Sequence, residues 1–422
     1  MERLRIAINA QLMPDGAAGG TVTVLRALTS LTYLDDGAEE YVFIGPPDAP
    51  EWLRPMLGPS AKIIPGPTID LGVDKYERLK RALGPLRPTM RELKRMFSTP
   101  LEYIEPNFYE RLNCDVVHFP FQVAEKCSLP VVYNPHDLQH LHYPEFFSAE
   151  EIANRERSYP DACRAAETVV VASEFVKDDV VKHYGISPDK IQVISWAPPP
   201  LQTSGPALNS DGFASLKEKY DLPDSPFALY PAMTWEHKNH LRLLQALALL
   251  RDRDNVTLRL VCTGHKTEFW SRIESEVKAL ALEETVKFVG LIPNDELSVL
   301  YRAAQFVCIP SLFEAASAPM FEAWQHDVPV ASSSIISLRE QAADGALMFD
   351  PQSIDPIAEA LRRMATDESL REALRRCGRK RLRDFSLERT AKTYRAVYRR
   401  AAGRFLSDED RWLLCSNSAP TP

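Results

Sequence analysis

The sequence predicts an α/β protein built from two doubly wound, Rossmann-like domains that face a cleft. Short apolar runs, typical of buried strands, alternate with amphipathic helical stretches along most of the 422 residues. Such alternation favours parallel sheets with helices on both faces. It stops once, in the Pro-, Ser- and Gly-rich segment 196–212, and then starts again. We therefore expect a first domain over 1–200, a second over 201–385, and a ligand cleft between them.

The first half contains a series of apolar runs that predict strands. These runs are 5–11, 41–45, 62–66, 115–119, 130–134, 168–173 and 191–195. A helix is expected over 21–34, which has an apolar face of helical period. Two more are expected over EEIANRERSYPDACRAAE and EFVKDDVVKHYG.

The second half repeats this pattern of strands separated by helices. Its apolar runs are 227–233, 256–264, 286–290, 306–311, 329–334 and 347–351. The helical stretch that follows is longer than a closed second domain needs. We therefore expect the helix 386–404 to pack back on the first domain, and the segment 405–422 to be a mobile tail.

Composition narrows the class of protein. Hydrophobic residues make up 45% and charged residues 26%, as in ordinary globular domains. The net charge of -8 argues against nucleic acid as a partner. The seven cysteines include no CxxC pair, which favours reduced thiols over a disulfide framework or a zinc site. With no signal-peptide pattern and no apolar run near ~18 residues, we expect a cytoplasmic protein.

One segment, 74–97, departs from the strand–helix alternation. Basic and apolar residues interleave there, as in an amphipathic pair of helices. Such a pair could make a peripheral contact with the inner face of a membrane or receive an acidic acceptor. The alternative, which we favour, is a helical insertion whose basic face is solvated.

Two glutamates separated by seven residues, Glu314 and Glu322, are the most informative feature of the chain. A small-residue loop after an apolar strand carries the first, and a helix that opens near Ala318 carries the second. Ser317 suits the N-cap and Pro319 the first turn. Helix N-termini at the carboxyl ends of parallel strands hold phosphates, so this turn is expected to contact a ligand. Alternatively, Glu314 is solvated and Glu322 caps a neighbouring loop.

A basic turn, WEHKNH, follows the strand 227–233. Lys238 is therefore expected at the carboxyl end of a strand, where an ammonium group can neutralise a diphosphate. His237 could share this work if it is protonated. A solvated surface lysine is the alternative.

Two further loops could present backbone groups to a ligand. Gly19 and Gly20 are expected in the loop between the first strand and the first helix, where glycines permit close approach to a phosphate or sugar. Gly290 ends a strand, and the following loop, which contains Ile292, could offer amides and carbonyls to a planar base. Paired glycines are also ordinary in loops without ligands.

Three histidines lie in the run NPHDLQHLHYPEFF. His136 is expected at the carboxyl end of a strand, within reach of a ligand. His140 and His142 follow, but no HExxH-type spacing or evident acidic third ligand accompanies the three. We therefore expect no metal site, and packing in a turn is an equal alternative for the latter two histidines.

Together these motifs resemble the retaining GT-B glycosyltransferases of the family 4, group 1 type. The resemblance covers nearly the whole chain and is strongest over 227–351. The matching motifs are the Lys238-Asn239 turn, VGLIP, the glutamate pair, DVPVASSS, SLREQ and FDP in the second half, and HDLQH and VASEFVKDDV in the first.

The resemblance implies a role for each motif residue. Glu314 would contact the donor sugar near the reacting carbon, and Glu322 would bind the ribose hydroxyls. Lys238 would hold the diphosphate, and His136 would lie beside the transferred sugar. Ser317 and Ala318 would contact the donor at the helix N-terminus.

Two departures from the family pattern stand out. The family usually has glycines and an aromatic residue after the first glutamate, where this chain has Ala315, Ala316 and Ser317. Methyl groups there narrow the approach of backbone amides to a sugar. Many members also place an arginine near the lysine, whereas this chain has His237, so less permanent positive charge is expected at the phosphates.

The sequence thus predicts a metal-independent glycosyltransferase that needs no cofactor. Its partners would be a nucleotide-sugar donor, GDP-mannose or a UDP-sugar, and a saccharide or lipid-linked acceptor in glycan or polysaccharide synthesis. Two alternatives remain open. One is a nucleotide-sugar hydrolase or epimerase on the same fold, and the other is a non-catalytic nucleotide-sugar-binding relative.

Overall fold

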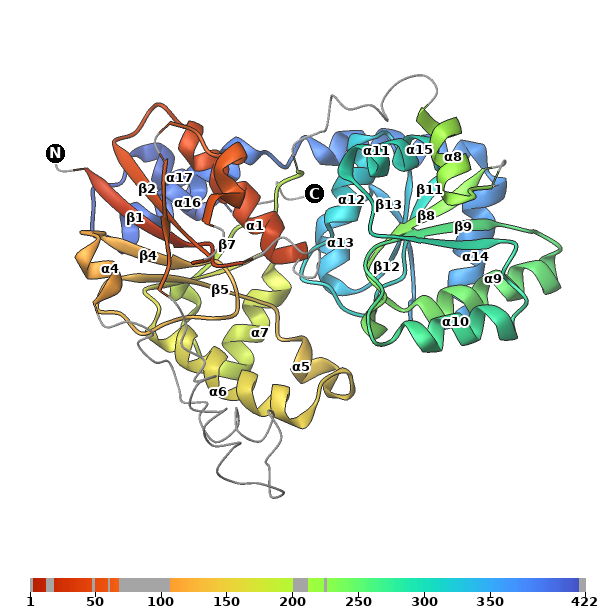
Figure 1. The fold of residues 1–422 in the computed structure, drawn as a ribbon, viewed down its shortest axis with the longest axis horizontal. Coiled ribbons are helices and arrows are strands. Elements are labelled where there is room, and N and C mark those ends of the chain that lie inside the picture. The colour runs from red at the N-terminus through yellow and green to blue at the C-terminus, as the bar shows by residue number, and fades with distance from the viewer. Residues whose placement is uncertain are drawn as a thin grey trace.

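The computed structural model describes residues 3–12, 19–47, 50–59, 61–67, 107–199, 212–223 and 226–416. They form two lobes that lie side by side, each with a central sheet covered by helices (Figure 1). Most strands are continuous apolar runs because both faces of such a sheet are covered. The prediction of two doubly wound α/β domains is confirmed.

The first lobe holds a seven-stranded parallel sheet among the described residues. Its strands are β1 (Leu4–Asn9), β2 (Glu39–Gly45), β3 (Ala61–Pro65), β4 (Val116–Phe119), β5 (Val131–His136), β6 (Thr168–Val171) and β7 (Ile191–Val193). They lie in the order β3-β2-β1-β4-β5-β6-β7. The order changes direction between β1 and β4, and ligands bind beyond the carboxyl ends of strands at such a point.

Helices cover both faces of this first sheet. They are α1 (Gly19–Thr29), η1 (Ser30–Tyr33), η2 (Pro50–Met56), α4 (Phe108–Arg111), α5 (Gln139–His142), η3 (Pro144–Phe146), α6 (Ala149–Ala165), α7 (Glu174–Tyr184) and η4 (Pro188–Lys190). Their ends follow local sequence signals. A capping box between Ser148 and Glu151 starts α6, and Gly185, with a φ of 65°, ends α7.

The second lobe holds a six-stranded parallel sheet among the described residues. Its strands are β8 (Phe227–Pro231), β9 (Arg259–Thr263), β10 (Val286–Gly290), β11 (Phe306–Ile309), β12 (Val330–Ser333) and β13 (Ala346–Phe349). They lie in the order β10-β9-β8-β11-β12-β13, so the direction changes between β8 and β11.

Helices cover this second sheet on both faces as well. They are α8 (Gly212–Tyr220), η6 (Glu236–Lys238), α9 (His240–Asp254), α10 (Trp270–Ala279), α11 (Asn294–Ala303), α12 (Ala318–Gln325), α13 (Ile336–Ala342), α14 (Ile354–Thr366) and α15 (Glu368–Leu382). Each lobe therefore has one point where the strand order changes direction, at the carboxyl ends of its own strands.

Helix α16 (Leu387–Ala401) lies on the first lobe, beside β1 and β2 (Figure 1). Its buried Ala391, Val397 and Tyr398 belong to the apolar cluster that contains Ile6 and Leu25. Contacts with α1 and β5 extend this packing. The chain thus crosses to the second lobe and returns to the first.

Residues 405–416 are not the mobile tail expected for 405–422, whose last six residues lie outside the described part of the chain. Residues Asp408–Cys415 form helix α17, which packs against α16. Ser407 and Asp410 form its capping box, and the buried Asp410 carboxylate accepts hydrogen bonds from Arg399 at 3.0 and 3.1 Å. An N-cap serine, an acidic first turn and the buried Leu413 therefore give this short segment a fixed position.

Two predicted features lie outside the described residues. The basic segment 74–97 is one, and most of the linker 196–212 is the other. Within the described parts of the chain, no helix has the length and apolarity needed to cross a bilayer.

Candidate active site

The carboxyl ends of β8 and β11 bring the basic turn and the first glutamate together. Asn239 fixes the turn, because it adopts a left-handed conformation with a φ of 63°. Its side-chain amide donates to the carbonyls of Pro310 and Pro351, both at 2.9 Å. Tyr230 adds a hydrogen bond to the carbonyl oxygen of Lys238 at 2.7 Å. The backbone around Lys238 is therefore held by buried hydrogen bonds.

Lys238 and Glu314 form an ion pair in this crevice. The Lys238 Nζ lies 2.5 Å from Oε1 of Glu314, which also accepts from the Ser311 hydroxyl at 2.8 Å. The two charged side chains keep 18% and 13% of their exposure, so the pair is partly withdrawn from water. An ammonium group has three donors, and Lys238 can bind an anion without giving up Glu314.

His237 is not the protonated partner that the sequence suggested. Removal from water and the neighbouring Lys238 charge hold the pKa of His237 well below its usual value. The imidazole is therefore neutral at pH 7. Its backbone carbonyl instead accepts from the amide of Leu312 at 2.8 Å, which joins the basic turn to the loop after β11.

The loop after Glu314 is anchored to α13. The Ser337 hydroxyl donates to the carbonyl of Glu314 at 2.5 Å. Gln341 accepts from the amide of Ser317 at 2.7 Å and donates to its carbonyl at 2.8 Å. Ser317 occupies the N-cap as predicted, with Ala318 and a proline opening α12, but its hydroxyl makes no capping bond. That hydroxyl is buried and has no partner among the described residues.

Ala315, which stands in place of a family glycine, and Ala316, which stands in place of the family's aromatic residue, are packed. Ala315 and Ala316 are buried and belong to the apolar cluster that contains Val171 and Val176 of the first lobe. Their methyl groups therefore contribute to contact between the lobes.

Glu322 lies near the middle of α12. Its carboxylate accepts from the Tyr301 hydroxyl at 2.6 Å, and burial raises the pKa of Glu322. The same carboxylate lines a cavity of about 350 Å³ between the lobes. The lining residues are Arg26, Thr29, Ser30, Tyr33, Met56, Pro199, Asn294, Leu297, Ser298, Tyr301, Glu322, Gln325 and His326.

The predicted glycines have a different setting from the one expected. Gly19 and Gly20 are the first residues of α1 and not part of a loop. A Cβ at Gly20 would lie 3.0 Å from the Trp196 ring, so that position has little room for a side chain. Gly290 has a φ of 77°, and Ile292 buries its side chain in the core, so these two residues can offer a ligand only their backbone groups.

His136 ends β5 in a left-handed conformation with a φ of 64°. Its Nε2 lies 2.8 Å from the carbonyl oxygen of Pro120, and burial lowers the pKa of His136. His140 is packed between aromatic rings, as the alternative reading proposed. His142 has the acidic neighbour that we did not find in the sequence, because Asp179 comes from a distant helix.

Several residues that shape the site were missed. Tyr301, Ser311, Ser337 and Gln341 contact the two glutamates or their loop through side chains. Ser337 and Gln341 begin and end the SLREQ motif, four positions apart on α13, and that helical spacing was the available signal. No comparable pattern links Tyr301 to Glu322.

Comparisons with known proteins agree with this architecture. The family model described as "Glycosyl transferases group 1" matches residues 213–381, and "Glycosyltransferase Family 4" matches 37–196. Together these matches span most of both lobes.

Three individual proteins illustrate the similarity. O-antigen chain mannosyltransferase B from Escherichia coli is 26% identical over 60% of this chain and 66% of its own, just under two thirds of its length. D-inositol 3-phosphate glycosyltransferase from Kribbella flavida is 23% identical over 82% of this chain and 84% of its own. The structure of HepE from Anabaena with UDP and glucose has a TM-score of 0.65 at 15% identity, over 93% of this chain and 99% of that one.

These matches cover the lobe that carries the glutamate pair and the lobe that faces it. The chain belongs to the group 1, family 4 glycosyltransferases and has their two-domain GT-B fold.

Proposed function

We propose that this protein transfers a sugar from a nucleotide sugar to an acceptor hydroxyl, with retention at the anomeric carbon. The observation that carries the proposal is the Lys238–Glu314 pair at the carboxyl ends of β8 and β11. Breaking the bond to a diphosphate leaves negative charge on the leaving group and positive charge on the sugar. Lys238 is positively charged and Glu314 is negatively charged, so the pair can stabilise both the leaving group and the sugar.

Lys238 stabilises the leaving diphosphate, and the N-terminus of α12, near Ser317 and Ala318, adds its dipole. Glu314 stabilises an oxocarbenium-like sugar on the other side. His136 lies beside the transferred sugar as a neutral imidazole. His237 is uncharged and does not share the neutralisation of the diphosphate. Its backbone carbonyl joins the turn of Lys238 to the loop after β11.

Glu322 binds the ribose of the donor in the cavity between the lobes. The raised pKa of its carboxyl group reflects burial, and hydroxyl donors from a ribose supply hydrogen bonds that a buried carboxylate lacks. The backbone of Gly290 and Ile292 faces the base, and the amides of Gly19 and Gly20 at the start of α1 face the phosphates or sugar.

The donor is GDP-mannose or a UDP-sugar, and the acceptor is a saccharide or lipid-linked glycan. The O-antigen mannosyltransferase relative favours mannose and polysaccharide synthesis, while HepE was solved with UDP and glucose. A cytoplasmic location is part of the proposal, while a solvated basic insertion stays the favoured interpretation of 74–97 over contact with the inner face of a membrane.

Transfer is proposed to be metal-independent, because Lys238 and a helix N-terminus face the diphosphate. Activity should therefore persist in excess chelator. Loss of turnover in chelator, with recovery only when Mg²⁺ or Mn²⁺ is added, would contradict this charge assignment.

Incubation with a panel of GDP- and UDP-sugars tests the function itself. Slow donor hydrolysis without acceptor, and faster consumption with it, are expected for a transferase. Fast turnover without acceptor would indicate a nucleotide-sugar hydrolase or epimerase. The absence of binding to every donor would indicate a relative that has lost the activity.

A further inference from the structure

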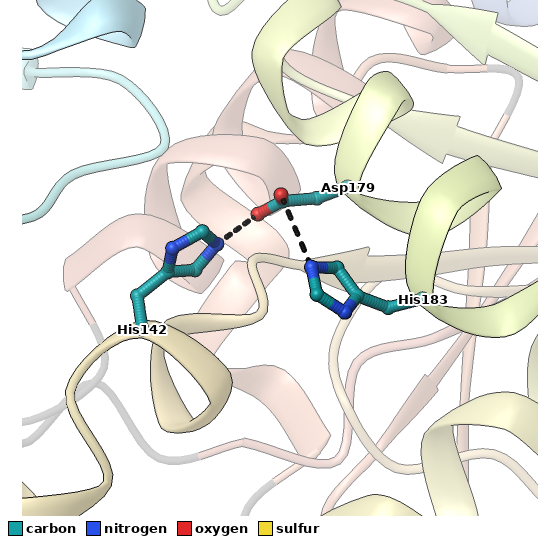
Figure 2. A group of neighbouring side chains, drawn as sticks. All are labelled: His142, Asp179 and His183. Atoms are coloured by element: carbon teal, nitrogen blue, oxygen red, sulfur yellow. Dashed lines mark hydrogen bonds and ion pairs between the residues drawn. The ribbon is translucent and has the colours of Figure 1, made fainter.

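Three side chains with metal-binding atoms converge on the first lobe. His142 comes from the end of α5, and Asp179 and His183 come from α7 (Figure 2). Their ligand atoms all lie within 4.8 Å of one another, the single such group of three or more among the described residues. We propose that these three residues bind a divalent transition-metal ion of the zinc class.

The ligand set suits that class of ion. Two imidazoles and one carboxylate are borderline and hard donors, which Zn²⁺ combines in tetrahedral sites with water in the fourth position. An oxygen-only cation such as Ca²⁺ or Mg²⁺ would not favour two imidazoles.

The arrangement needs only a small change to coordinate a metal. Tetrahedral bonds of about 2.1 Å place neighbouring ligand atoms roughly 3.4 Å apart. Here His142 Nε2 lies 2.5 Å from Asp179 Oδ2, and His183 Nε2 lies 3.9 Å from Oδ1 of the same carboxylate. The first distance must lengthen by about 0.9 Å and the second shorten by about 0.5 Å. All three ligand atoms lie within 4.8 Å of one another, so no pair must close by more than about 1.4 Å.

The metal replaces a hydrogen bond in this group. Without a metal, Nε2 of His142 shares a hydrogen bond with the Asp179 carboxylate. A metal would take the Nε2 lone pair in place of that hydrogen bond, and Nδ1 can carry the ring proton of the coordinated imidazole.

The three side chains differ in their exposure to solvent. Asp179 is buried, with 7% of its side chain exposed, while His142 and His183 keep 28% and 30%. Asp179 and His183 are four residues apart on one helix, so they share a face. An ion can therefore reach a fixed carboxylate through two accessible imidazoles.

The site also lies against the second lobe. The His142 ring packs on Phe313, with ring centroids 5.2 Å apart, and Phe313 immediately precedes Glu314. Phe175 of α7 completes this aromatic contact at 5.7 Å from His142. A bound metal would join α5 to α7 at the point where both meet the loop of the first glutamate.

Equilibrium dialysis of the full, untagged chain with Zn²⁺ tests the proposal. One tightly bound equivalent is expected, and Co²⁺ in its place should give visible d–d absorption. His142→Gln, Asp179→Asn and His183→Gln should each weaken binding by more than about 100-fold, since even loss of a supporting contact costs 10–100-fold. The exposed His265, outside the group, gives the control His265→Gln, which should bind as wild type.

Absence of saturable binding in wild type, or equal binding by wild type and all three variants, would overturn the site. Circular dichroism of each variant distinguishes loss of a ligand from loss of the fold. The assay contains no donor or acceptor, so its outcome is independent of the proposed transferase activity.

Discussion

Tyr230 holds the backbone of Lys238 in place, and Glu314 partly balances the Lys238 charge before any donor binds. Charge on the leaving diphosphate grows as the bond breaks, so Lys238 matters most in the transition state. We predict that Lys238→Ala lowers the transfer rate by roughly 10²–10³ and changes donor binding much less. Steady-state kinetics with the exposed Lys278→Ala as control measure this. A change confined to KM would contradict it.

Glu125 is a buried carboxyl group in the first lobe, next to Asn9 and Tyr109. Burial raises the pKa of Glu125 to about 7. The folded state therefore holds a proton that the unfolded chain releases at lower pH. Stability is full below the unfolded pKa and falls as pH rises through 7, by at most about 3 kcal/mol.

Denaturant titrations between pH 5 and 8 measure this dependence. Glu125→Gln should remove most of the decline, whereas the exposed Glu268→Gln should keep it. Parallel pH profiles for wild type and Glu125→Gln would show that Glu125 does not control it.

Helix α12 packs against α15 through a close contact between Trp324 and Gly378. A Cβ at Gly378 would lie 2.4 Å from Cδ1 of the buried Trp324, whose indole N–H donates to Gly345 at 3.1 Å. Gly378→Ala should destabilise the protein by about 1–3 kcal/mol, because the indole must leave its place. Lys380→Ala, exposed on the same helix, is the control in thermal unfolding. Equal stability of the two variants would argue against this contact.

Elements governed by local signals were predictable from the sequence. The strands follow apolar runs, and α6 and α7 begin at N-cap serines and end where the sequence suggests. The start of α1 at Gly19 was not predictable, because glycines are poor helix formers and favour a loop assignment. Helix α17 was missed although Ser407 and Asp410 form a local capping box, because the contact that holds this short helix, from Arg399 to Asp410, comes from another helix.

At the scale of the whole molecule, Glu340 joins the two lobes. Its carboxylate on α13 accepts from the amides of Glu174 and Phe175, at 3.0 and 2.9 Å, at the start of α7. Loss of that carboxylate leaves two helix N–H groups without their partner.

We predict that Glu340→Ala shifts the lobes towards an open arrangement, at a cost of about 1–3 kcal/mol to the closed one. Small-angle scattering should show a larger radius of gyration than for wild type or the exposed control Glu359→Ala. Superimposable curves would mean that other contacts hold the lobes.

The candidate site was predictable only in part, for a physical reason. Lys238 and Glu314 follow strands, and Glu322 lies in a helix whose start is marked by Ser317, so local sequence signals all three. Ser311 is only three residues from Glu314, but Tyr301 reaches Glu322, and Asp179 reaches His142, through the tertiary fold. Contacts between distant elements leave no local pattern.

In the proposed site, Glu314 contacts the sugar of the donor and Glu322 binds its ribose. Titration calorimetry with the nucleoside diphosphate alone, on wild type, Glu322→Gln and Glu314→Gln, separates the two roles. Glu322→Gln should weaken binding by roughly 1.5–3 kcal/mol, because a charged acceptor is lost. Glu314→Gln should bind nearly as wild type, since its sugar is absent. Equal weakening by the two variants would contradict this division of the donor.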